Sequence, residues 1–264
     1  MKYLFKFLAR RLYNDFFRPS REMDYEKILI AAKRCGYEVH TILSFEDVIR
    51  EGVNPEKKYL ILRRDIDTGD FYILRKMLNL EKKYGARATY YFRWNTINLE
   101  LMHDIAEAGG EASYHYEEIA TYCYKHRITT KEKMLEHLEE IRDLFIEQYP
   151  KFKEKTKQPC LTIASHGDYM NTRFQYQNYE LINDRVRNAC GFVREAYDRE
   201  HMSALTCRLA DQNEKELFTQ KAIETIERGE PVLELLTHPR QWNSPFWINL
   251  KEEINRVCKQ IYMR

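Results

Sequence analysis

Hydrophobic positions along the chain fall into two patterns that alternate. Short apolar runs bounded by glycine, proline or polar turn residues are typical of buried strands, whereas apolar residues three and four positions apart predict amphipathic helices. The short runs predict about seven strands. The clear ones lie at residues 59–65, 86–94, 111–117, 160–167 and 231–239, and weaker ones lie in 189–197 and 202–211. Because strands that alternate with helices favour parallel pairing, the pattern predicts an α/β barrel or a doubly wound sheet.

Helical patterns fill the intervals between the predicted strands. One helix is expected to end at Gly36 and another at Gly85, and a long amphipathic helix at 131–150 is expected to stop at Pro150. No segment rich in proline, serine and glycine divides the chain, so we expect one domain. We place a helical extension in residues 1–55, packed on a barrel formed by residues 56–264.

The N-terminus carries an amphipathic pattern of its own. Leu4, Phe5, Leu8, Leu12 and Phe16 recur at helical spacing, and lysines and arginines lie on the flanks. We expect this helix to pack its apolar stripe on the domain. A basic amphipathic helix can also lie on an anionic membrane surface, so peripheral membrane contact remains an alternative.

Composition narrows the class of protein. With 44% hydrophobic residues the chain can bury a sizeable core, and a formal net charge of +2 is too balanced to suggest a nucleic-acid partner. The six cysteines lie far apart and form no CxxC pair, which favours reduced thiols and a cytoplasmic protein. We expect neither a secretory signal nor a stretch of about 20 apolar residues that would span a bilayer.

The candidate chemistry lies where the predicted strands end. Polar side chains end four of the strands: Asp65 and Asp67 the first, His115 and Glu117 the third, His166 the next long one and His238 the last. In parallel α/β sheets the carboxyl ends of the strands share one rim, where active sites are built. A single histidine there is more often an ordinary residue, and Glu117 and Glu118 could be no more than first-turn acids of a helix. Together, however, these residues predict a metal site, because imidazole and carboxylate suit zinc, and also iron, cobalt, nickel or manganese.

Two arginines come directly before Asp65. On a strand, Arg63 and Arg64 must point to opposite faces, one inward and one outward. An inward arginine beside Asp65 would lower the pKa of that carboxyl group and keep it ionised.

The order of the motifs resembles the polysaccharide deacetylase family (NodB-homology, carbohydrate esterase family 4) from about residue 59 to residue 242. Asp65-Ile66-Asp67 matches the family's first motif, GARATYYFR its second strand, AGGEASYHYEE the segment with its first metal histidine, at His115, and LLTHPRQW its closing Leu-x-His motif, at His238. The chain looks most like a branch associated with bacterial surface-polysaccharide gene clusters, including those for O-antigen. The resemblance implies an irregular (β/α)7 barrel, in agreement with the strand count, and metal-dependent removal of acetyl groups from N-acetylated sugars.

The chain departs from the family pattern at two places. Ile119 stands where the family has its second metal histidine, and ASHGDY replaces the usual Arg-x-Pro-Tyr-Gly motif. His166, within the replaced motif, could supply the missing imidazole, or Glu117 or Glu118 could supply a carboxylate. Zinc usually takes three protein ligands and leaves one position open, which Asp67, His115 and His166 would satisfy.

The resemblance also implies how the residues would act. Asp65 would accept a proton as general base, and His238 would donate one to the departing amine. Residues that we expect to line the sugar-binding cleft or contact a polar substrate group are Arg93, Tyr114, Tyr116, Asp211 and Trp242. Reduced thiols favour a nucleotide- or lipid-linked sugar precursor as substrate. Two other functions remain open: hydrolysis of a non-sugar C–N bond such as that of a cyclic ureide, and saccharide binding without catalysis.

Overall fold

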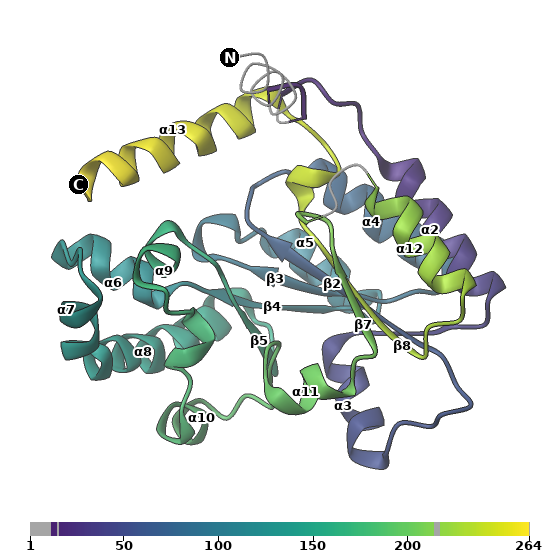
Figure 1. The fold of residues 1–264 in the computed structure, drawn as a ribbon, viewed down its shortest axis with the longest axis horizontal. Coiled ribbons are helices and arrows are strands. Elements are labelled where there is room, and N and C mark those ends of the chain that lie inside the picture. The colour runs from purple at the N-terminus through teal and green to yellow at the C-terminus, as the bar shows by residue number, and fades with distance from the viewer. Residues whose placement is uncertain (1–11, 15, 214–216, 264) are drawn as a thin grey trace.

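One parallel sheet occupies the centre of the molecule. The computed structural model describes residues 12–14, 16–213 and 217–263, and Figure 1 shows how the strands and helices are arranged. The strands follow the order β6-β5-β4-β3-β2-β8-β7, with β1 paired beside the start of β2. Their bounds are β1 Glu38–His40, β2 Tyr59–Ile66, β3 Thr89–Phe92, β4 Glu111–Tyr116, β5 Thr162–Ser165, β6 Arg194–Glu195, β7 Cys207–Ala210 and β8 Val232–Thr237. All of the pairings are parallel.

The predicted α/β architecture with an irregular parallel barrel is confirmed. Each predicted strand is present, and β1 is an addition that is too short to show a sequence pattern. Within the described residues β6 and β7, at the two ends of the path, do not pair, so the barrel is incomplete. The addition of β1 also means that part of the segment 1–55 joins the sheet.

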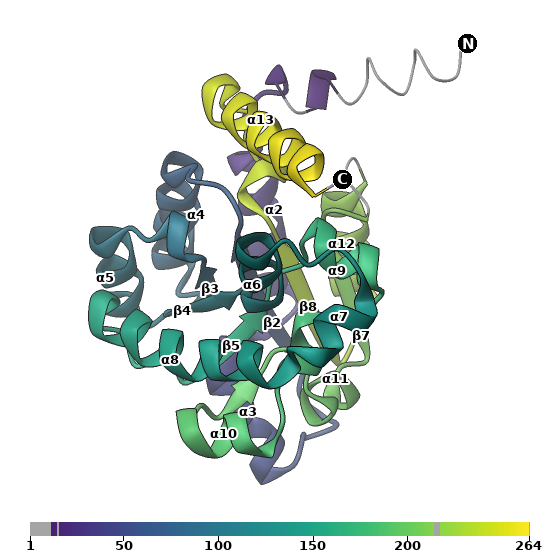
Figure 2. The same ribbon diagram turned by 90° about the vertical axis from the view of Figure 1, so that its left-hand side faces the viewer.

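Helices surround the sheet on its outer side and at its ends (Figures 1 and 2). The longer ones are α2 Glu22–Arg34, α3 Ile42–Glu51, α4 Phe71–Tyr84, α5 Leu99–Glu107, α6 Glu118–His126, α8 Leu138–Thr156, α12 Phe218–Glu227 and α13 Phe246–Tyr262. The shorter ones are α7 Lys131–Glu136, α9 Tyr169–Phe174, α10 Asp184–Cys190, α11 Arg199–Ala204 and the 3₁₀ turns η1 Trp94–Thr96, η2 Asn178–Leu181 and η3 Pro239–Gln241. In Figure 1, α13 extends across the upper side of the molecule, and α2, α4 and α12 lie together at its right.

The two faces of the sheet pack into different hydrophobic clusters. Along β2, Leu60 and Leu62 belong to the large cluster under the surrounding helices, whereas Tyr59 and Ile61 belong to a small cluster with Phe45 of α3. This division follows from strand geometry, because successive side chains point to opposite faces. Every residue of β2 is buried, so both faces of the central strand are covered. The inner face of the sheet is the side that carries Tyr59 and Ile61 of β2.

Two expectations about helices need correction. The predicted helix 131–150 is divided at His137 into α7 and α8, and α8 continues past Pro150 to Thr156. Pro150 does not end the helix because Phe152, which is fully buried, continues the apolar stripe beyond it. Gly85 ends α4 in the left-handed conformation that glycine adopts without strain, as predicted.

The expectations about the N-terminal helix, membrane-spanning segments and cysteines can be compared with the described residues only. The predicted N-terminal amphipathic helix lies largely outside the described residues. No helix in the described ranges is long and apolar enough to cross a membrane. All six cysteines fall inside those ranges, and each is a free thiol.

Candidate metal centre

The register of the strands brings Asp67 and His115 to one level of the sheet. Ile66 of β2 and Tyr114 of β4 both pair with Phe92, in the strand between them. Asp67 and His115 each come one residue further along their strands, so they share the next level. Because side chains alternate between faces, both then point to the inner side, away from the face of Ile66 and Tyr114.

The third member of the group comes from the end of β5. His115 pairs with Ala164, and His166 follows two residues later on the same face. The backbone N–H of His166 donates to the carbonyl of Tyr116 at 2.8 Å, which continues the pairing of β4 with β5 past the last strand residue. Three separate strands thus place their polar ends around one point.

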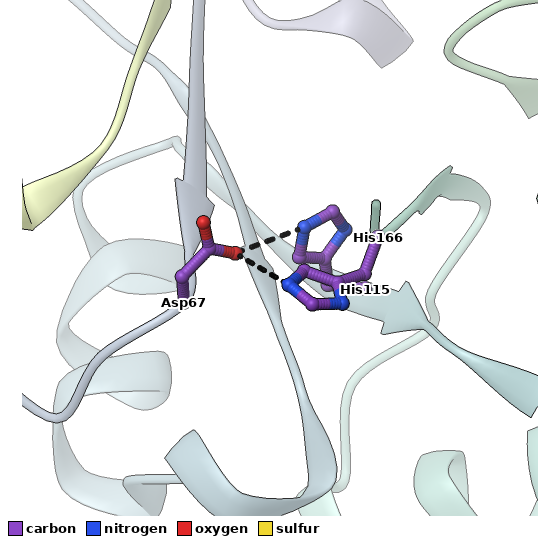
Figure 3. A group of neighbouring side chains, drawn as sticks. All are labelled: Asp67, His115 and His166. Atoms are coloured by element: carbon purple, nitrogen blue, oxygen red, sulfur yellow. Dashed lines mark ion pairs between the residues drawn. The ribbon is translucent and has the colours of Figure 1, made fainter. Parts of the chain in front are cut away.

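Asp67, His115 and His166 form a compact cluster (Figure 3). Oδ1 of Asp67 lies 3.3 Å from Nε2 of His115 and 3.5 Å from Nε2 of His166. One ligand atom from each residue lies within 4.8 Å of the others. Two imidazole nitrogens and one carboxylate oxygen are the donor set of many catalytic zinc sites, in which a fourth position stays open.

The hydrogen bonds of His115 show that this donor set fits a cation. Nδ1 of His115 lies 2.9 Å from the carbonyl oxygen of Ala164, which can only accept, so Nδ1 carries a proton. In a neutral ring, Nε2 then presents a lone pair toward Asp67. Oδ1 of Asp67 is itself buried and, among the described residues, has no hydrogen-bond partner. A positive charge between these atoms would satisfy both, and a bond from the second ring nitrogen to a carbonyl is the usual way in which proteins orient a metal-ligating histidine.

Charge in the site keeps Asp67 ionised. Burial would raise its pKa, but the neighbouring His166, followed by His115 and His238, holds the pKa of Asp67 well below its usual range. An ionised carboxylate is the form that binds a metal.

Glu117 supports His166 from the side opposite Asp67. Its Oε2 lies 3.4 Å from Nδ1 of His166, and its carboxylate accepts hydrogen bonds from Nε and Nη2 of Arg93 at 3.2 and 2.6 Å. Burial would raise the pKa of Glu117, but His166 and Arg93 hold it well below its usual range. Glu117 is therefore placed to orient His166, and Arg93, expected to bind substrate, is engaged by Glu117 instead.

Glu118 and Ile119 lie away from the cluster. The side chain of Glu118 accepts a hydrogen bond from the hydroxyl of Tyr114 at 2.5 Å, and burial raises its pKa to about 7. Ile119 is fully buried in the main hydrophobic cluster. Of the replacements considered for the missing family histidine, the structure places only His166 in a common group with Asp67 and His115.

Asp65 is held on the inner face by Arg63, two positions before it. Its carboxylate accepts hydrogen bonds from Nε and Nη2 of Arg63 at 2.9 and 2.8 Å, and it lies 3.7 Å from Nε2 of His115. Burial would raise the pKa of Asp65, but the charge of Arg63, followed by that of His115, lowers it. Arg64 points to the other face, where it donates to Glu81 at 2.5 Å. The predicted opposite orientation of the two arginines is confirmed.

His238, at the end of β8, is bound to Asp211, at the end of β7. Nδ1 of His238 lies 2.7 Å from Oδ1 of Asp211, whose Oδ2 accepts from the backbone N–H of His238 at 2.7 Å and from Nε1 of Trp242 at 2.8 Å. Burial would lower the pKa of His238, but Asp211 and the carboxylates at the end of β2 raise it to about 9. The ring is therefore a proton donor at neutral pH.

Several residues expected in a sugar-binding cleft are buried elsewhere. Trp242 is fully buried against Tyr25 and Phe218. Asp211 is 1% exposed, and its oxygens bind His238 and Trp242, so it faces no cleft. Neither side chain is placed to line a cleft, because Asp211 turns back from the end of β7 and Trp242, after the turn η3, packs into the core.

The two tyrosines beside His115 also lie away from the expected sugar-binding cleft. Tyr114 stacks on Phe152 of α8 with ring centroids 4.4 Å apart, and the hydroxyl of Tyr116 donates to Glu195. Both lie on the helix side of β4, because neighbours of an inward residue point outward. Neither lines a cleft at the metal cluster, which corrects the expectation.

The fold and the cluster together define a parallel α/β barrel with a candidate mononuclear metal centre at the carboxyl ends of its strands. No family model matches the chain, and no curated protein matches it. Solved structures do. The Streptococcus pyogenes deacetylase PplD, solved with acetate, has 17% sequence identity over 64% of this chain and 68% of its own, with a TM-score of 0.42.

Two further structures extend this likeness. A carbohydrate esterase family 4 pseudoenzyme from Bacillus anthracis has 18% identity over 78% of this chain and 63% of its own, with a TM-score of 0.45. The peptidoglycan deacetylase PdaC from Bacillus subtilis has 13% identity over 79% of this chain and 99% of its own, with a TM-score of 0.36. The likeness concerns the fold, so the roles of individual residues rest on the geometry of this chain.

Proposed function

We propose that the protein is a metal-dependent amide hydrolase that removes an acetyl group from an N-acetylated sugar. The observation that carries this proposal is the cluster of Asp67, His115 and His166, with two further ionisable groups, Asp65 and His238, at the same rim. A ligand set with an open position beside a separate acid and base is the arrangement that hydrolysis of an amide requires.

Asp67, His115 and His166 would hold the ion, for which zinc is the first candidate and iron, cobalt, nickel or manganese are alternatives. When bound, such an ion polarises a carbonyl group and lowers the pKa of water from about 15.7 toward 7. The carbonyl of Ala164 holds the ring of His115, and the carboxylate of Glu117 lies 3.4 Å from Nδ1 of His166.

Asp65 would act as the general base. Arg63 binds its carboxylate through two hydrogen bonds, which fix its orientation and keep it ionised. Asp65 takes a proton from the water that attacks the acetyl carbon, and a positioned base of this kind typically contributes about 10²–10⁴-fold to the rate.

His238 would act as the general acid. An amine leaves readily only after it is protonated, and Asp211 keeps the ring of His238 protonated near neutral pH. The proton passes from His238 to the sugar nitrogen as the C–N bond breaks, which leaves acetate and a free amino sugar. Asp211 is thus a positioning residue, and not a contact to substrate.

The substrate we infer is a nucleotide- or lipid-linked sugar precursor used in making a bacterial surface polysaccharide such as O-antigen. Free thiols support a cytoplasmic setting. The balanced net charge of +2 gives no support to a nucleic-acid partner. Peripheral contact with a membrane through the basic N-terminal segment remains a prediction.

The proposal is tested by metal analysis of the purified protein and by measuring acetate released from N-acetylhexosamines in free, nucleotide-linked and lipid-linked form. We expect stoichiometric metal and acetate release from one of these classes. Asp65→Asn should keep the metal and lose acetate release. Protein that binds a saccharide but holds no metal would be the silent binding protein, and activity on a cyclic ureide alone would replace the sugar amide as substrate.

A further inference from the structure

The last helix of the chain, α13, turns its apolar side to solvent. Figures 1 and 2 show it along the upper edge of the molecule. Apolar residues three and four positions apart form a stripe along the whole helix, namely Trp247, Leu250, Ile254, Val257 and Ile261. All of them except Leu250 are exposed, and the exposed fractions of Trp247 and Ile261 are 78% and 63%.

The polar side of α13 faces the body of the protein. Asn249 is fully buried, and Glu252, Glu253 and Gln260 are partly buried. Glu253 accepts a hydrogen bond from Arg240 of η3 at 2.7 Å. A surface helix normally does the reverse, because burial of its apolar stripe is what holds it to the core. The stripe of α13 is thus left without cover among the described residues.

Aromatic residues that precede α2 extend this exposed surface. The ring of Phe246, at the start of α13, lies 5.4 Å from that of Phe16 and 6.3 Å from that of Phe17. Phe17 is 66% exposed and Tyr13 is 52% exposed. We call the stripe, together with Tyr13 and Phe17, the α13 surface. Large contiguous apolar patches are rare on monomeric proteins and mark sites of interaction with another protein or a membrane.

The charges beside the α13 surface are complementary to an anionic partner. The exposed charged residues of α13 are all basic: Lys251, Arg256 and Lys259. The acids of the helix, Glu252 and Glu253, lie on the side that faces the body. The sequence 1–18, which ends beside α13, is also basic, with Lys2, Lys6, Arg10, Arg11 and Arg18 against the single acid Asp15.

These charges favour a lipid surface over a second copy of the chain. Two copies joined through α13 would bring basic residues against basic residues, which is unfavourable. A bilayer with anionic headgroups offers an apolar layer for the stripe and negative charge for the lysines at its edge, and aromatic side chains are enriched at that depth. No helix of the described residues could cross the bilayer, so the contact would be peripheral.

The α13 surface lies at the end of the barrel where the strands end. Lys259 lies over the ring of Tyr124 in α6, 4.9 Å from its centroid, and Arg173 of α9 donates to the carbonyl of Met263 at 2.8 Å. The helices α6 and α9 follow directly on β4 and β5, whose ends carry the histidines of the metal cluster. A membrane on the α13 surface would therefore lie at the same end of the barrel as the cluster, although the inference does not depend on the proposed hydrolysis.

We propose that α13 docks the protein on an anionic membrane surface. The helix lies in the plane of the interface, with Trp247, Ile254 and Ile261 among the acyl chains and Lys251 at the level of the headgroups. The polar side of the helix keeps its contacts with the body of the protein, so docking requires no rearrangement of the fold.

The test is sedimentation of the full chain with phosphatidylglycerol vesicles and, separately, with phosphatidylcholine vesicles. We expect stronger binding to phosphatidylglycerol, weakened by salt. Ile254→Ser should weaken binding by about ten-fold, because it removes one aliphatic side chain from the lipid. Lys251→Gln should weaken it by about five-fold. Leu99→Ser is the matched control, because Leu99 of α5 is 52% exposed, against 53% for Ile254, and it should leave binding unchanged.

Tryptophan fluorescence gives a second measurement of the same contact. Trp247 is the most exposed of the three tryptophans, since Trp242 is fully buried and Trp94 is partly buried. Its emission should shift to shorter wavelength when phosphatidylglycerol vesicles are added. Trp247→Phe keeps an aromatic ring in the stripe, so it should keep the binding and lose the shift.

The outcomes separate a membrane from the other ways of covering the stripe. Loss of vesicle binding in folded Ile254→Ser, or in Ile261→Ser if the first variant does not fold, with Leu99→Ser unchanged, would support the proposal. Absence of wild-type binding to phosphatidylglycerol, equal binding to phosphatidylcholine, or unchanged binding in the folded stripe variants would overturn it. A dimer in solution that Ile254→Ser dissociates would overturn it as well, and would assign the stripe to a second copy of the chain.

Discussion

Replacing His166 by alanine tests whether this residue completes the metal centre. Its Nε2 lies 3.5 Å from Oδ1 of Asp67, and its side chain is 12% exposed, so the change removes one donor together with the contacts of a largely buried ring. Binding free energies of structural zinc sites with four ligands are about 10–16 kcal/mol, so one ligand accounts for roughly 2.5–4 kcal/mol. At 1.4 kcal/mol for each factor of ten, the dissociation constant for zinc should rise about 10²–10³-fold.

The structure also predicts the order of effects among related variants. Glu117→Gln keeps the size of the side chain but weakens its hold on His166, and loss of such an outer partner typically costs about 10–100-fold in metal affinity. His103→Ala is the matched control, because His103 is exposed on α5, away from the cluster. We expect the loss of affinity to be largest for His166→Ala, intermediate for Glu117→Gln and absent for His103→Ala.

Zinc affinity is measured by competition with a chromogenic chelator and checked by thermal unfolding. A ligand at 100 times its dissociation constant stabilises the folded state by about 2.7 kcal/mol, and a 100-fold weaker site at the same zinc concentration gives only about 0.4 kcal/mol. For a chain of this size the wild type should gain about 5–10 °C in Tm, and His166→Ala should gain almost nothing. If folded His166→Ala binds zinc as tightly as the wild type, His166 is not a ligand and the centre must be completed in another way.

Three further variants examine the groups around the cluster. Asp65→Asn should lower kcat by about 10²–10⁴-fold without changing zinc content, and loss of zinc would make Asp65 a ligand instead. Arg63→Met leaves the carboxylate of Asp65 buried without its partner and should lower the free energy of unfolding by about 3–5 kcal/mol in urea; a loss below about 1 kcal/mol would contradict the importance of the pair. The wild-type kcat/KM should fall as pH rises through about 9, where His238 loses its proton, and Asp211→Asn should move this limb toward about 6.5, the ordinary value for histidine. An unmoved limb would exclude His238 as the titrating acid.

Much of the architecture was readable from the sequence because strand patterns are local. Each apolar run bounded by turns became a strand, and parallel pairing then brought the polar ends to one rim. Asp67, His115 and His166 meet because the register aligns the ends of β2, β4 and β5. The choice of His166 over Glu118 required three dimensions, because only the fold shows that the side chain of Glu118 is buried and accepts a hydrogen bond from Tyr114, away from the cluster.

The orientation of Tyr114 and Tyr116 could have been predicted from the sequence. With His115 facing inward, alternation along the strand requires Tyr114 and Tyr116 to face outward, so their removal from the cleft follows from the same rule that placed His115. Trp242 and Asp211 had no such signal. Trp242 follows a 3₁₀ turn, and Asp211 meets His238 only because β7 pairs with β8.

The carboxylates near the rim differ in whether their hydrogen-bonding needs are already met. Three of them have donors of their own: Asp65 has Arg63, Glu117 has Arg93, and Asp211 has His238 and Trp242. Each would lose these bonds if it turned toward a metal, so these groups fix the shape and charge of the site. Among the described residues, Oδ1 of Asp67 has no hydrogen-bond donor and faces two ring nitrogens. Because one carboxylate oxygen is available where the others are occupied, the structure distinguishes the proposed metal ligand Asp67 from the proposed base Asp65, although only one residue separates them in the chain.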